Sequence, residues 1–87
     1  MIKEYILSFS SFYKAAYAQD MLEHEGIHTT LKKLPTELVR SCSTGLYLRT
    51  SSMEPVYRVL DDKGIICGGV FEISHDADRK RVYTKIK

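Results

Sequence analysis

The sequence predicts a single α+β domain in which two helices pack against one antiparallel sheet. Four segments alternate apolar and polar side chains, as half-buried strands do. Two segments between them repeat apolar residues with helical period, and Gly26 and Gly64 follow these segments as C-terminal stops. The chain of 87 residues is long enough for one domain and too short for two.

The first β-α-β unit is predicted to begin with a strand over residues 5–9 and to end with a strand over residues 27–33. Between the two strands, Ser10 and Ser11 offer side-chain oxygens for the N-cap of a helix, and Gly26 ends that helix. The stripe that this helix buries is predicted to contain Phe12, Ala15, Ala18 and Leu22.

The second unit is predicted to contain strands over residues 45–50 and 65–73, and it follows a loop over residues 34–43. Its helix begins near Ser51 and Glu54, which have the spacing of a capping box. The residues expected to form most of the core of both units are Leu7, Ala15, Ala18, Leu22, Leu46, Leu48, Val56, Val59, Leu60 and Phe71.

The resulting order, β-α-β-β-α-β with both helices on one face of a four-stranded antiparallel sheet, is the ferredoxin-like plan. We expect residues 1–73 to form this single domain. Residues 74–87 are predicted to be a basic C-terminal tail or an extra strand, because Val82, Thr84 and Ile86 alternate with other residues. We expect this polar segment to be dispensable for folding.

Charge and hydropathy limit the partners. The net charge is +2, and the C-terminal tail, with five basic and two acidic residues, carries +3, which leaves the body at −1. A body of this charge does not favour binding to nucleic acid. No apolar run approaches the roughly 20 residues of a membrane span, and the N-terminus does not read as a signal peptide. We therefore expect a cytoplasmic protein without a membrane partner, whose cysteines are free thiols.

Several short motifs occur together in an order that is typical of one family. They are Glu25-Gly26-Ile27, Pro35-Thr36, the serine-rich segment Ser41 to Ser43, Gly45-Leu46, and the closing segment Gly69 to Ile73. By these motifs the chain resembles, from about Tyr5 to Ile73, a family of small bacterial proteins described as selenium/sulfur carrier-like. The resemblance implies a protein that takes a sulfur or selenium atom onto a cysteine and passes it to a partner protein.

The chain departs from the family pattern at the cysteine. In the family the cysteine directly precedes a glycine, whereas here Thr44 precedes Gly45 and Cys42 lies two residues upstream of Thr44. If this segment is extended, positions two apart share a face, so Cys42 presents its thiol on the side where the family has its own. If the segment turns, it does not.

Cys42 is the candidate carrier thiol, and the alternative is an ordinary loop cysteine. Arg40 is the candidate group that stabilises its thiolate, and neighbouring hydroxyls at Ser41, Ser43 and Thr44 would add hydrogen bonds. Such a carrier needs no cofactor and no catalytic set, and its partners would be sulfur or selenium donor and acceptor proteins. Nothing in the chain favours a self-contained enzyme.

The second cysteine, Cys67, is flanked by Ile65, Ile66 and, after two glycines, Val70. This setting predicts a buried thiol that acts as a small apolar side chain. The alternative is a resolving partner for Cys42.

The alternative function is a non-enzymatic protein- or ligand-binding or regulatory module that acts through the sheet face without helices. Tyr47 and Arg49 are predicted to lie on that face, opposite Leu46 and Leu48. The same face would also suit a homodimer, with Ile6, Tyr47 and Val70 in the contact. The RNA-recognition signature of aromatic residues is absent, so nucleic acid is not the expected partner.

A metal site is not predicted. His24 and His28 have the i, i+4 spacing of helical metal ligands, but Gly26 lies between them and should end the helix. No glycine-rich phosphate loop joins a strand to a helix, since Gly68-Gly69 falls within a predicted strand.

Overall fold

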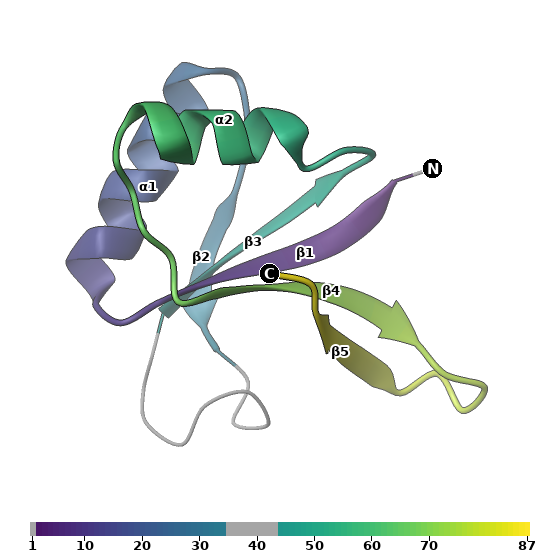
Figure 1. Ribbon diagram of the computed structural model, residues 1–87. Coiled ribbons are helices and arrows are strands. Elements are labelled where there is room, and N and C mark those ends of the chain that lie inside the picture. The colour runs from purple at the N-terminus through teal and green to yellow at the C-terminus, as the bar shows by residue number, and fades with distance from the viewer. Residues whose placement is uncertain (1, 35–43) are drawn as a thin grey trace.

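The computed structural model describes residues 2–34 and 44–87 of the chain. Five antiparallel strands form one sheet, in the order β2-β3-β1-β4-β5. Two helices lie on one side of it (Figure 1). Along the chain the elements are β1 (Lys3–Phe9), α1 (Phe12–His24), β2 (Thr30–Lys33), β3 (Thr44–Thr50), α2 (Glu54–Asp62), β4 (Gly69–His75) and β5 (Arg81–Lys85).

The predicted order β-α-β-β-α-β is confirmed for the first six elements, and the ferredoxin-like prediction is confirmed in part. The sheet has five strands and not four, because residues 81–85 pair with β4 as an antiparallel edge strand. The alternation of the tail residues is therefore that of a strand, and the segment is not a frayed end over these five residues.

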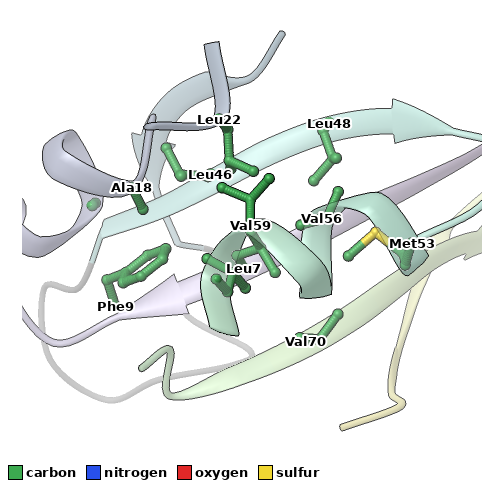
Figure 2. Close-up of a cluster of buried hydrophobic side chains, with 12 residues drawn as sticks. Leu7, Phe9, Ala18, Leu22, Leu46, Leu48, Met53, Val56, Val59 and Val70 are labelled. Carbon is green, nitrogen blue, oxygen red and sulfur yellow. The ribbon is translucent and has the colours of Figure 1, made fainter. Parts of the chain in front are cut away.

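The main core lies between the helices and the sheet (Figure 2). Leu7 of β1 stands opposite Leu46 of β3 and Val70 of β4, so all three side chains point to the helices. Nine of the ten predicted core residues are buried. They are Leu7, Ala15, Ala18, Leu22, Leu46, Leu48, Val56, Val59 and Leu60. We call this side of the sheet the helix-covered face.

Local signals set the ends of α1 as predicted. The Ser11 side chain caps the helix by accepting a hydrogen bond from the backbone N–H of Lys14, at 3.1 Å. At the other end Gly26 has φ +80, and the N–H of Ile27 donates to the carbonyl of Leu22, which closes the last turn. One prediction is wrong: Phe12 is 57% exposed, because it begins the first turn beyond the edge of the core.

The second helix starts differently from its prediction. The predicted capping box is not formed, because the N-cap residue is Met53 and makes no side-chain cap. The backbone N–H of Glu54 instead donates to the Ser52 hydroxyl at 3.3 Å. Pro55 occupies the first turn, where its missing N–H costs little. The helix ends before Gly64, which has φ +65.

The fourth strand begins later than predicted, at Gly69. The N–H of Ile65 donates to the carbonyl of Leu60 at 2.8 Å, so this residue still belongs to the closing turn of α2. Pairing with β1 starts only near Ser8, whose carbonyl accepts a hydrogen bond from Gly68 at 2.7 Å. The strand prediction over residues 65–73 is therefore wrong at its start, and Cys67 lies in the connection between α2 and β4.

The other side of the sheet, which we call the second face, also buries apolar groups. Ile6 is fully buried there, and Leu34 and Ile73 are nearly so. Three partly buried aromatic residues, Tyr47, Phe71 and Tyr83, pack against them. Phe71 was predicted in the main core, but it stands opposite Ile6 and so points to the second face.

Two residues of the predicted dimer contact are not available on the second face. Ile6 is covered within its own chain, and Val70 stands opposite Leu7 in the main core. The error at Val70 arises because the predicted strand began at Ile65, whereas β4 begins at Gly69. A shift of one residue in the alternation sends a side chain to the other face. The homodimer itself stays a prediction.

Candidate functional site

The structure describes only part of the predicted site. Arg40, Ser41, Cys42 and Ser43 lie outside the described residues. The other three residues of the prediction, Thr44, Tyr47 and Arg49, all belong to β3.

The sheet separates those three residues between its two faces. Thr44 stands opposite Phe9 and alternates with Leu46, so its side chain belongs to the helix-covered face. Tyr47 and Arg49 belong to the second face, where Tyr47 stands opposite Ile6. The Thr44 hydroxyl is therefore not a neighbour of Tyr47 and Arg49, the two residues predicted to bind a partner.

Tyr47 is held in place by β2. Its hydroxyl donates a hydrogen bond to the backbone carbonyl of Lys33 at 3.3 Å. The ammonium of Lys32 lies 5.4 Å from the centre of the Tyr47 ring, in cation–π geometry. The ring also packs against the apolar cluster of the second face. The aromatic side chain is thus a fixed part of this surface.

A groove of about 460 Å³ lies around Tyr47 and Arg49. Its charged lining consists of Lys32 from β2, Arg49 from β3, Arg81 from β5 and Glu4 from β1. We call this the basic groove. Glu4 and Arg49 are direct cross-strand partners, so the only carboxylate in the described lining stands beside one of the three cations.

Arg81 joins the groove through the pairing of β5 with β4. Its guanidinium keeps a pKa above the usual value, chiefly because of a hydrogen bond with the Tyr83 side chain and further because of nearby Glu4. Arg81 was not among the predicted site residues, because the basic segment that contains it was expected to be a tail or an extra strand with no identified partner strand. The alternation of residues 82–86 indicated a strand, but it did not identify β4 as the partner that brings Arg81 to the groove.

Cys67 lies at a second cavity, of about 310 Å³, beside Tyr57, Lys85 and Lys87. It is a free thiol and is partly buried, with its side chain packed against the edge of the main core. Burial raises the pKa of this thiol, although hydrogen bonding from the backbone and the positive charge of Lys87 act in the opposite direction. The prediction of a buried, apolar-like thiol is therefore confirmed in part: the side chain packs on the core but is only half-buried.

The two histidines near the end of α1 face carboxylates. His24 Nε2 lies 3.9 Å from Asp20 Oδ1, and His28 Nδ1 lies 3.6 Å from Glu23 Oε1. Across residues 2–34 and 44–87, no three side chains of the metal-binding types come together as a group that would hold an ion. Neither described helix has the length and apolar character needed to cross a membrane.

Comparison with protein families gives a match over most of the chain. No curated protein and no solved structure matches the chain. A family model described as "Putative Se/S carrier protein-like" matches residues 4–84, which includes all five strands and both helices almost completely. The chain therefore belongs to the Se/S carrier protein-like family.

Proposed function

We propose that this protein accepts a sulfur or selenium atom on the Cys42 thiol and passes that atom to a partner protein in the cytoplasm. The observation that carries the proposal is the match of the family model to residues 4–84. Arg40 would stabilise the Cys42 thiolate, and the hydroxyls of Ser41, Ser43 and Thr44 would donate hydrogen bonds to it.

The transfer is an exchange between a thiolate and a persulfide. The Cys42 thiolate attacks the terminal sulfur of a donor persulfide, donor–S–SH, and a new S–S bond forms as the donor's S–S bond breaks. The bonding electron pair leaves with the donor sulfur, which becomes a thiolate, and the terminal proton stays with the transferred sulfur. An acceptor thiolate then repeats the step and releases the Cys42 thiolate. A donor–S–SeH group would give the selenium adduct in the same way.

The chemistry of Cys67 supports the choice of Cys42. The thiolate is the reactive form of cysteine, and burial raises the pKa of Cys67, so less of that thiol is ionised at neutral pH. A smaller thiolate fraction slows the attack of this thiol on a persulfide sulfur. Of the two cysteines in the chain, Cys42 is therefore the better candidate.

A two-stage labelling experiment tests the proposal. The protein is loaded by a cysteine desulfurase with cysteine that carries radiolabelled sulfur, separated from the enzyme, and mixed with a protein thiol acceptor. We expect the label to move to the acceptor with the native chain and with Cys67→Ser, and to be absent with Cys42→Ser. Arg40→Gln should load more slowly. Label that stays on the protein when acceptor is in excess would contradict a carrier role.

A second candidate function is a binding or regulatory module that acts through the second face, and the basic groove around Tyr47 and Arg49 favours it. Such a module would not need the thiol. Replacing Tyr47 and Arg49 together with alanine should then abolish partner capture, whereas Cys42→Ser should leave it unchanged. The opposite pattern would exclude this function.

A further inference from the structure

We infer that the basic groove docks an acidic, extended segment of the protein that donates or receives the carried atom. The role of that partner rests on the proposed carrier function, whereas the chemistry of the segment follows from the groove itself. The groove is a surface feature of the second face, lined by side chains from four of the five strands.

Charge selects an acidic ligand. Lys32, Arg49 and Arg81 supply three positive charges, and Glu4 supplies the one negative charge of the described lining, so this groove has a net charge of +2. The net charge of this one groove equals the net charge of the whole chain, which is also +2. Arg49 and Arg81 also offer planar guanidinium groups, which bind carboxylates with two parallel hydrogen bonds.

The spacing of the cations favours a segment of chain over a small anion. Lys32 lies on edge strand β2, whereas Arg81 lies on edge strand β5, at the other end of the sheet order. Four strand spacings of roughly 4.8 Å separate the backbones of these two edge strands, or about 19 Å, and the long Lys32 and Arg81 side chains line the groove between them. An extended segment of about six residues spans that length, at roughly 3.3 Å per residue. Inorganic phosphate or sulfate is shorter than this span and would contact only a part of the basic groove.

The surroundings of Tyr47 argue against a stacked nucleotide base. The Lys32 ammonium already lies over the ring, and the phenol hydroxyl is bonded to the backbone of β2. A flat base would have to displace the ammonium before it reached the ring. A carboxylate has no such requirement, because it pairs with Lys32 where the ammonium stands.

The groove is well separated from Thr44, which lies two residues after Cys42 in the sequence. Arg49 follows Thr44 by five residues on β3, which corresponds to about 17 Å along the strand at 3.3 Å per residue, and the two side chains point to opposite faces. A partner segment held in the groove therefore leaves the environment of Thr44 to the group that exchanges the atom. The basic groove and the Thr44 side chain thus lie on different faces of the sheet.

The direct test uses a fluorescent hexaglutamate peptide as the probe, with binding followed by anisotropy at low salt. Charge reversal by Arg49→Glu with Arg81→Glu should weaken binding by at least about tenfold. The matched control, Lys14→Glu with Lys63→Glu, makes the same change of charge at two exposed residues on the helix side of the molecule. It should weaken binding by less than about threefold, and both variants should keep the native melting curve.

Three results would overturn the inference. The first is equal weakening in the groove variant and the control, which would show attraction by net charge alone. The second is no measurable binding of hexaglutamate by the native chain. The third is binding of an oligothymidylate or of inorganic phosphate that exceeds hexaglutamate binding and is lost in the groove variant, which would assign the groove to nucleic acid or to a small anion.

A loading experiment separates this inference from the carrier proposal. Inorganic polysulfide delivers sulfur without protein docking, so the Arg49→Glu, Arg81→Glu variant should load normally from it and at least about tenfold more slowly from a desulfurase. Normal loading of the variant from both sources would contradict docking in the groove. Failure of the native chain to load from either source would contradict the carrier proposal. The binding of hexaglutamate would still test whether the groove docks an acidic segment.

Discussion

Leu34 packs directly against Gly45 on the second face of the sheet. A Cβ at position 45 would overlap Leu34 Cδ2 and would lie 3.1 Å from Ile6 Cγ2. The missing side chain of Gly45 therefore lets Leu34 cover Ile6, which is fully buried although it points away from the helices. This contact explains why a glycine begins the apolar part of β3.

Gly45→Ala should lower the free energy of unfolding by about 1–3 kcal/mol, because Leu34 must move out of its position or Ile6 must shift. Urea unfolding measures the loss. Gly69→Ala is the matched control, since a Cβ there meets its nearest neighbour at an ordinary 3.4 Å. Shortening Leu34 to alanine in the Gly45→Ala chain should remove part of the penalty. A strictly additive double variant would show that the two residues do not interact.

Leu48→Ala should lower the free energy of unfolding by about 2–4 kcal/mol, because Leu48 is nearly fully buried against the helices. The exposed control is Ile66→Ala, which removes an apolar side chain that is 85% exposed and should change stability by no more than about 0.5 kcal/mol. Equal effects of the two substitutions would contradict the assignment of the core.

A chain that ends at Ser74 should unfold at a clearly lower temperature than the full chain. The sequence alone predicted a dispensable tail, but the structure gives reason to expect a loss, because β5 pairs with β4 and Tyr83 packs on the buried cluster of Ile6 and Ile73. We expect the free energy of unfolding to fall by more than about 2 kcal/mol, largely because the packing of Tyr83 is lost. Thr84→Ala, on an exposed side chain of β5, should have little effect. An unchanged melting temperature would restore the prediction from sequence.

The contrast between α1 and β5 shows what local sequence can determine. The ends of α1 depend on neighbours in the chain, the Ser11 hydroxyl at one end and the positive φ of Gly26 at the other, so they are readable from sequence. The strand β5 depends on a partner strand that the alternation of its residues does not identify. Its assignment, and with it the place of Arg81 in the groove, required the fold.

The wrong faces predicted for Phe71 and Val70 have the same cause, which is that the sequence does not show how the strands pair. Phe71 and Val70 were assigned to faces by extending a strand back to Ile65, whereas the closing turn of α2 uses that residue. Because side chains alternate along a strand, the pairing of β4 with β1 and not the run of apolar residues decides which of the two faces the core. The predicted site on Tyr47 and Arg49 lay on a strand whose phase was right, so both residues share one face as expected.

The two thiols should titrate in different pH ranges. In a Cys42→Ser chain, the alkylation rate of Cys67 by iodoacetamide should rise only above the ordinary thiol pKa of about 8.5, because burial raises the pKa of Cys67. The contribution of the Cys67 thiol to stability is then complete below the pKa that this thiol has in the unfolded chain. It is lost as the pH rises through the higher pKa that the thiol has in the folded chain. In a Cys67→Ser chain, a carrier thiol at Cys42 should react at lower pH. A higher midpoint for Cys42 than for Cys67 would contradict the carrier assignment.

The central claim is that Cys42 carries the atom, and intact-mass measurement after incubation with a cysteine desulfurase and cysteine tests it most directly. We expect the native chain to gain the mass of one sulfur atom, and a thiol reductant should remove that gain. The gain should persist in Cys67→Ser and disappear in Cys42→Ser. A gain that follows Cys67 and not Cys42, or no gain in the native chain, would contradict the claim.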